Sequence, residues 1–125
     1  MSTTRRKVLI VEDDPVTAKA HRNRISAAGY DVQVATDGEQ ALQELQSFRP
    51  DALLLDVNLP GRSGLDVLKT IRASPEFQKL PVFVFSVTVD DALMAECTSA
   101  GATAVVEKWN LTSSVLLENL ATALR

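Results

Sequence analysis

Acidic side chains follow two apolar runs of this sequence. Asp56 comes directly after Ala52–Leu55 and shortly before a Pro-Gly pair, and Glu12 and Asp13 come directly after Val8–Val11. Apolar runs of this length, bounded by turn residues, predict strands that are buried on both faces. Because open α/β sheets build their sites at the carboxyl ends of their strands, we expect these carboxylates to lie side by side. Like charges so close together repel unless a cation lies between them, and Mg²⁺ suits a site of oxygen ligands and water.

A hydroxyl and an ammonium group follow two later apolar runs. Ser86 comes after the run 82–85, and Lys108 comes after the run 104–106. Taken singly, each group has a structural explanation, because an acidic pair can cap a helix, a serine can end a strand and a lysine is usually solvated. Together they predict phosphoryl transfer with Asp56 as the nucleophile. Lys108 would place a positive charge on one phosphoryl oxygen, and Ser86 would donate a hydrogen bond to another.

The same residues predict how a metal ion would be bound. We expect Asp13 and Asp56 to hold Mg²⁺ directly, with Glu12 acting through water. The backbone carbonyl of Asn58 is expected to complete the ligand shell. The metal would neutralise charge on the incoming phosphoryl group and bridge it to the nucleophile.

Strands and helices are predicted to alternate along the chain. Five apolar runs predict strands at residues 8–11, 31–35, 52–55, 82–85 and 104–106. Helices are expected between Pro15 and Gly29, after a capping box formed by Thr36 and Glu39, between Ser63 and Pro75, from 90 to 100, and from 112 to 124. This alternation predicts an α/β fold, with a doubly wound parallel sheet of five strands and helices on both faces.

The composition is that of a single globular domain, which we assign to residues 1–125. The chain has 46% hydrophobic and 23% charged residues, which is ordinary for such a domain. A net charge of −3 argues against direct nucleic-acid binding, and the apolar runs are too short to span a membrane. Cys97 is the only cysteine, which fits a reducing cytoplasm, and it is expected to be a packing residue. His21 lies among polar neighbours and is predicted to be a surface side chain.

The motifs that carry the chemical groups resemble those of bacterial response-regulator receiver domains, over essentially the whole chain. The family's acidic pocket is matched by Glu12-Asp13-Asp14-Pro15, and its phosphoacceptor loop is matched by Asp56–Gly64. Its last two strands are similar to Pro81–Ser86 and to the segment from Gly101 that leads to Lys108. The resemblance implies a flavodoxin-like sheet with the strand order 2-1-3-4-5.

The resemblance also implies a function and partners. A histidine kinase or a histidine phosphotransfer protein would donate a phosphoryl group to Asp56. The chain would catalyse this transfer and the later hydrolysis on itself, and we do not class it as an enzyme. Phosphorylation would draw Ser86 and Lys108 toward the site and change a surface that binds a downstream effector, usually the fourth helix, fifth strand and fifth helix. The chain would be a monomer or would form a homodimer on activation.

Three residues depart from the family's pattern. Trp109 follows Lys108, where the family usually has a proline whose peptide bond is commonly cis. We expect a trans bond here, because a cis bond before a residue other than proline costs about 3 kcal/mol. Val105 stands where the family often has an aromatic residue that changes rotamer, and Val87 stands where it usually has alanine. We expect Val87 to narrow access to the phosphoryl site, and either to slow the reaction with small phosphodonors or to alter exchange with the kinase.

Two other functions compete with this one. Val87, Val105 and Trp109 are compatible with an interaction module that works without phosphorylation, although the acidic residues and Lys108 argue against it. A Mg²⁺-dependent phosphatase with an aspartyl intermediate usually has an acid two residues after its nucleophile, where this chain has Asn58. The sequence leaves open the cognate kinase, the output and whether the chain is complete.

Overall fold

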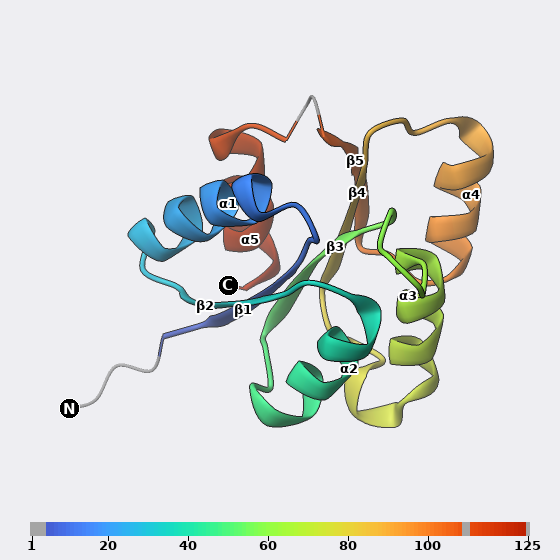
Figure 1. The fold of residues 1–125 in the computed structure, drawn as a ribbon, viewed down its shortest axis with the longest axis horizontal. Coiled ribbons are helices and arrows are strands. Elements are labelled where there is room, and N and C mark those ends of the chain that lie inside the picture. The colour runs from blue at the N-terminus through green and yellow to red at the C-terminus, as the bar shows by residue number, and fades with distance from the viewer. Residues whose placement is uncertain (1–4, 109–110, 125) are drawn as a thin grey trace.

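A computed structural model describes residues 5–108 and 111–124, in which strands and helices alternate (Figure 1). The strands are β1 (Lys7–Val11), β2 (Asp31–Ala35), β3 (Ala52–Asp56), β4 (Val82–Ser86) and β5 (Ala104–Glu107). The helices are α1 (Pro15–Ala27), α2 (Gly38–Ser47), α3 (Gly64–Ala73), the short 3₁₀ helix η1 (Pro75–Phe77), α4 (Asp91–Ser99) and α5 (Ser113–Ala123). Every predicted strand is confirmed, and all but β2 are one residue longer than the apolar run that predicted them.

The five strands form one parallel sheet in the order β2-β1-β3-β4-β5, which confirms the predicted fold class. Helices α1 and α5 cover one face of the sheet, and α2, α3 and α4 cover the other (Figure 1). The chain winds in opposite directions on the two sides of β1. The carboxyl ends of β1 and β3 therefore open onto the crevice in which doubly wound proteins bind their ligands.

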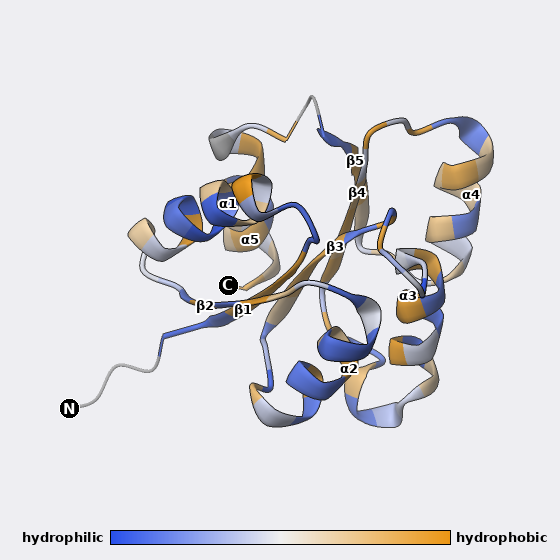
Figure 2. Cartoon of the chain, viewed as in Figure 1, coloured by the Kyte–Doolittle hydropathy of each residue, from blue (hydrophilic) through white to orange (hydrophobic). Residues whose placement is uncertain are grey.

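The core lies on both faces of the sheet because side chains alternate along each strand. Leu53 and Leu55 of β3 pack toward α2, α3 and α4, whereas Leu54 packs toward α1 and α5. Every residue of β3 and β4 is buried. Figure 2 shows the consequence, since the central strands are coloured as hydrophobic and the outer turns of α1 and α2 are hydrophilic.

Side-chain caps fix where the helices begin. The Ser63 hydroxyl accepts a hydrogen bond from the backbone of Asp66, as expected for the start of α3. The predicted Thr36 cap of α2 is wrong by one residue: the Asp37 carboxylate caps this helix by accepting from the Gln40 backbone. A capping box also has a second bond, in which a side chain of the first turn accepts from the backbone before the helix. Here the Gln40 side-chain oxygen accepts from the Thr36 backbone N–H at 2.6 Å. This bond replaces the predicted role of Glu39.

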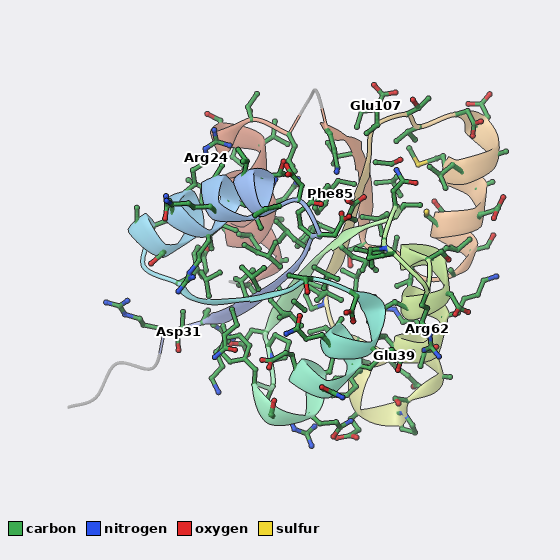
Figure 3. All side chains as sticks on the ribbon, in the orientation of Figure 1. Arg24, Asp31, Glu39, Arg62, Phe85 and Glu107 are labelled. Atoms are coloured by element: carbon green, nitrogen blue, oxygen red, sulfur yellow. The ribbon has the colours of Figure 1, made fainter. Side chains whose placement is uncertain are left out.

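The loop that follows β3 is tied to α2 at the surface. Glu39 points outward and its carboxylate lies 3.2 Å from the Arg62 guanidinium, as the labelled pair in Figure 3 shows. The guanidinium also lies 3.4 Å from the Asp66 carboxylate of α3. Both acidic partners are well exposed, so these ion pairs contribute little stability and mainly orient the loop.

His21 is not a surface side chain, and the sequence prediction is wrong. Its exposed fraction is 6%, and its ring packs edge-on against Phe85 with centroids 5.7 Å apart. Ala18, His21 and Ile25 are spaced by three and four residues and form the buried stripe of α1, so helical spacing decides the burial rather than the polarity of sequence neighbours. Burial lowers the pKa of His21, and the positive charges of Arg24 and Lys108 lower it further.

Gly64, the first residue of α3, lies against the backbone of the strand that precedes it. Its N–H donates to the Val57 carbonyl at 2.8 Å. A Cβ atom at this position would lie 2.2 Å from the Asp56 carbonyl oxygen and 2.7 Å from the Val57 Cα. Only glycine allows α3 to begin this close to the end of β3, and the close approach fixes the backbone that carries the Asp56 side chain.

Cys97 is fully buried on α4, as predicted for a packing residue. Within the described residues, none of the helices combines the length and apolar character needed to cross a lipid bilayer. The expectation for the peptide bond between Lys108 and Trp109 lies outside the described residues.

The burial of His21 predicts a pH dependence of folding stability. The unfolded chain binds a proton at the usual histidine pKa of about 6.5, whereas the folded state resists it. The contribution of His21 is therefore fully present above that pH and is lost as the pH falls below it. His21→Leu should lose less unfolding free energy than the parent between pH 7.5 and 5.5 in urea titrations. His21 is the only histidine, so equal losses in the two proteins would contradict the prediction.

The contact of Gly64 predicts a steric effect that can be separated from backbone strain. Gly64→Ala should cost about 3 kcal/mol of unfolding free energy in urea titrations, because the methyl group overlaps the Asp56 carbonyl. Gly61→Ala is the matched control in the same loop, since Gly61 has φ +75° but open space around its Cβ position. The control should cost about 1–2 kcal/mol through left-handed strain alone. Equal losses would show that the overlap has no effect.

Candidate functional site

The register of β1 against β3 brings three carboxylates together. Val11 pairs with Leu55, so Glu12, which directly follows β1, lies beside Asp56, the last residue of β3. Carboxylate oxygens of Glu12, Asp13 and Asp56 all lie within 4.8 Å of one another. Glu12 and Asp56 are buried and Asp13 is exposed, so the cluster has a buried base and an open side. The sequence prediction that these three residues meet is confirmed.

Lys108 joins the two buried carboxylates. It directly follows β5, and its side chain extends past β4 to the ends of β3 and β1. Its ammonium donates to Asp56 Oδ2 at 2.9 Å and to Glu12 Oε1 at 3.1 Å. The structure therefore places Lys108 in the acidic cluster, where the sequence predicted it.

The electrostatics of the cluster follow from burial and crowding. Burial raises the pKa of Glu12 to about 7, and hydrogen bonding with the neighbouring Asp56 carboxylate also raises it. Burial alone would lower the pKa of Lys108, but its bonds to Asp56 and Glu12 outweigh that effect and the pKa is raised. The cluster thus holds three carboxylates and one ammonium, which is bound to two of them. Such an excess of acidic oxygens, open on one side to water, fits a hard divalent cation such as Mg²⁺.

The Asp56 carboxylate is held at both of its oxygens. Oδ2 accepts from Lys108, and Oδ1 accepts from the Asn58 backbone N–H at 2.9 Å. The bond to Oδ1 places the Asn58 backbone beside the acidic cluster, and the proposed metal bond of its carbonyl stays a prediction. Ser86 is buried at the end of β4, next in sequence to Phe85, the register partner of Asp56. The structure therefore gathers all six predicted site residues at one edge of the sheet.

Sequence reasoning assigned no role to Gly64, Phe85 or His21. The role of Gly64 could have been inferred from the sequence. Glycine is unfavourable in a helix, so a glycine directly after the capping serine suggests that a side chain would not fit there. Phe85 looked like any other residue of an apolar strand. In the structure the Lys108 ammonium lies 5.5 Å from the centre of its ring.

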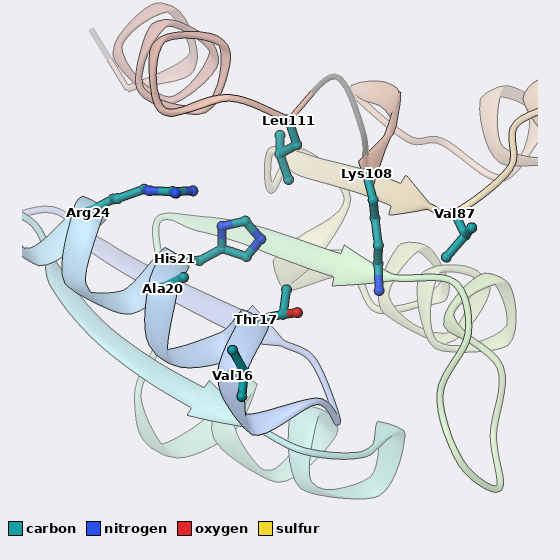
Figure 4. A pocket seen from close by; sticks show the side chains of 8 residues that line it. All are labelled: Val16, Thr17, Ala20, His21, Arg24, Val87, Lys108 and Leu111. Atoms are coloured by element: carbon teal, nitrogen blue, oxygen red, sulfur yellow. The ribbon is translucent and has the colours of Figure 1, made fainter.

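A cavity of about 410 Å³ opens beside Lys108, between α1 and the segment at Leu111 (Figure 4). We call it the α1 cavity. It is lined by Val16, Thr17, Ala20, His21, Arg24, Val87, Lys108 and Leu111. Figure 4 shows the Lys108 side chain descending between His21 and Val87. Two of its lining residues, Val16 and Val87, are exposed by 76% and 45%, which gives an apolar rim to a cavity with a charged wall.

Val105 is half-buried on β5 and packs against the core cluster that contains Cys97. Glu107, at the end of the same strand, accepts a hydrogen bond from the Val89 backbone at 3.4 Å. The loop between β4 and α4 is therefore tied to β5, next to the residue that follows the strand, Lys108.

Comparisons with known proteins agree with this arrangement. The chain matches the response regulator receiver domain family over residues 8–121. It is 38% identical to the DNA-binding response regulator MtrA of Mycolicibacterium smegmatis over 96 residues, 77% of this chain and 42% of that protein. It is 39% identical to the response regulator MprA of Mycobacterium ulcerans over 80 residues, 64% of this chain and 34% of that protein. The chain spans less than half the length of these relatives.

Solved structures show the same architecture. The chemotaxis response regulator CheY4 of Vibrio cholerae superposes with a TM-score of 0.89 at 29% identity, over 97% of this chain and 100% of that one. The BeF₃-activated N-terminal receiver domain of Klebsiella pneumoniae RstA gives a TM-score of 0.87 at 27% identity, over 95% and 98%. With a family match across nearly its whole length, the chain belongs to the receiver domains of response regulators.

Proposed function

We propose that residues 1–125 form one phosphoacceptor receiver domain, which takes a phosphoryl group on Asp56 from a histidine kinase or a histidine phosphotransfer protein. The observation that carries the proposal is the Lys108 ammonium bound to both Asp56 and Glu12 inside a cluster of three carboxylates. A purely structural ion pair would not need the third, exposed carboxylate of Asp13 at the same point.

The proposed reaction uses groups that the fold already holds in place. A carboxylate oxygen of Asp56 forms a bond to phosphorus while the phosphorus–nitrogen bond of the donor histidine breaks, and the bonding electron pair leaves with the imidazole. The Asn58 N–H keeps the carboxylate oriented through Oδ1. Lys108 pairs with a phosphoryl oxygen, and the Ser86 hydroxyl donates a hydrogen bond to another. Water later attacks the phosphoaspartate, which releases inorganic phosphate and restores the Asp56 carboxylate. The chain is proposed to catalyse both steps on itself.

The proposed cofactor is Mg²⁺. Glu12, Asp13, Asp56 and the Asn58 carbonyl would hold it, Glu12 through water. When bound, the ion supplies positive charge to the phosphoryl oxygens. The protein's part is to keep the cluster acidic and open, which the exposed Asp13 and the buried Glu12 do together.

The α1 cavity is the proposed docking surface for the phosphodonor. Its apolar rim at Val16 and Val87 lies beside Lys108, so a helix that packed there would bring its histidine to Asp56. The exposed Arg24 adds a positive charge at the edge of this surface. Because the net charge is −3, we propose that the chain itself contacts proteins rather than nucleic acid or membrane, in the cytoplasm.

The proposed output surface consists of α4, β5 and α5, which would bind an effector or a second copy of the chain on activation. The short side chain of Val105 cannot swing as an aromatic ring would. The readout is therefore proposed to depend on the loop between β4 and α4, which the Glu107 contact ties to β5.

The acceptor role of Asp56 is tested by intact-mass spectrometry after incubation with a phosphorylated histidine donor, with and without Mg²⁺. We expect a single phosphoryl adduct that requires Mg²⁺. It should be absent in Asp56→Asn, which keeps the size of the side chain but removes the nucleophilic charge.

A second probe separates chemistry from binding. The RstA receiver was solved in a BeF₃-activated form, so BeF₃⁻ with Mg²⁺ should shift backbone NMR signals around Asp56 in the parent but not in Asp56→Asn. A folded parent that forms no adduct and shows no response to BeF₃⁻ or Mg²⁺ would refute the phosphoacceptor function. It would favour an interaction module that works without phosphorylation.

The position of Val87 at the rim predicts a rate effect for small donors. Val87→Ala should raise the rate of Asp56 phosphorylation by acetyl phosphate about two- to fivefold, because a smaller side chain widens the approach to Lys108. Met94→Ala is the matched control, since Met94 is exposed by 42% on α4 and does not line the α1 cavity. Stopped-flow rates that are the same in Val87→Ala and Met94→Ala would show that Val87 does not restrict access.

A further inference from the structure

The Lys108 ammonium has a neighbour that carries no charge. It lies 5.5 Å from the centre of the Phe85 ring, within the range of a cation–π interaction. We infer that Phe85, supported by His21, is a positioning residue that aims Lys108 at the phosphoryl site. The inference rests on the proposed function, in which Lys108 pairs with a phosphoryl oxygen.

Phe85 is suited to this role by its place in the sheet. It is 1% exposed, and it is the register partner of Asp56 on the neighbouring strand. The aromatic face under Lys108 and the carboxylate in front of it are therefore carried by adjacent points of β4 and β3. Neither strand can shift without breaking the central ladder of the sheet, so the two partners of the lysine keep a fixed separation.

His21, on α1, packs against the Phe85 ring from the helix layer that covers this face of the sheet. Its imidazole packs against Phe85 at 74° between the ring planes, the edge-to-face geometry that aromatic pairs prefer. Its Nδ1 is buried and forms no hydrogen bond within the part of the chain that the structure describes. A buried polar atom without a partner is unfavourable. The contribution of His21 is therefore inferred to come from the shape of its imidazole ring and its contact with Phe85 rather than from a hydrogen bond.

The ring provides something that the carboxylates cannot. A lysine side chain is a flexible four-carbon stem, and it must be ordered before it can meet a phosphoryl oxygen at the right place. The negative charge of Asp56 is lost from that residue when it becomes an acyl phosphate, so its attraction for Lys108 changes during the reaction. The attraction of Phe85 is the same before and after, and it leaves the ammonium protons free to hydrogen bond.

The interaction is tested by replacing Phe85 with mono-, di- and trifluorophenylalanine. Fluorination weakens the negative potential of the ring face while it nearly preserves the ring's shape. The same series at Phe83 is the control, because Phe83 lies on the same strand and in the same core cluster and contacts no cation found in the described residues. We expect the rate of Asp56 phosphorylation to fall stepwise along the Phe85 series, by about three- to tenfold for the trifluoro ring. We expect it to stay level along the Phe83 series.

A second readout needs neither metal nor phosphodonor. The ring current of Phe85 should move the Lys108 Cε–Hε NMR signals upfield in the metal-free protein, and Phe85→Leu should abolish that displacement. His21→Ala should reduce it, and His21→Phe should restore it because an aromatic edge is again present. A hydrogen-bonding role of His21 would predict no rescue by phenylalanine.

The outcomes separate the inference from the proposed function. If the parent is not phosphorylated by any donor, the proposed function fails, and the NMR displacement alone decides whether Phe85 holds Lys108. If the parent is phosphorylated but its rate is the same along the Phe85 series, or falls equally along the Phe83 series, the inference is overturned and the phosphoacceptor function stands. An undisplaced Lys108 signal in the parent also overturns it.

Discussion

The arrangement of the site depends on one ammonium group bound between two buried carboxylates. Glu12 and Asp56 are 0% and 1% exposed, and buried charge is unfavourable by several kcal/mol unless it is paired. Lys108 supplies that pairing from the end of the edge strand β5, and its side chain reaches across the end of β4. The strand order makes this possible. It places β1 and β3 next to each other, and it places β5, which the lysine follows, two strands from β3.

The strands were predictable because the physical signal is strong where a strand is buried on both faces. β3 has buried apolar residues from Ala52 to Leu55, and such an unbroken run is typical of a parallel strand that is covered on both faces. The meeting of Asp13, Asp56 and Lys108 follows from the same signal, since topology brings the ends of parallel strands to one edge. The cap of α2 was missed by one residue because Thr36 and Asp37 are both good caps, and the Gln40 side chain decides between them.

The contacts of single side chains were not predictable in this way. The neighbours of His21 in the sequence are polar, but in space its ring packs against Phe85 and lines the α1 cavity, because α1 turns that face toward the sheet. The ring of Phe85 lies under Lys108 only because β4 and the end of β5 have the register that they do. Such relations belong to tertiary packing, and one sequence carries no local trace of them.

Alternate residues at the end of β4 face opposite sides of the sheet. Phe83 and Phe85 pack with α1 and α5, whereas Val82 and Val84 pack with the helices on the other side. By the same alternation, Ser86 belongs to the side of α4, and Phe85 belongs to the side of the α1 cavity. The strand thus places Phe85, which positions Lys108, on the side of the proposed donor surface. The next residue, Ser86, lies on the side of the proposed output surface. A phosphoryl group bound between Lys108 and Ser86 would contact both sides at once, so the two surfaces are linked through adjacent residues of a rigid central strand.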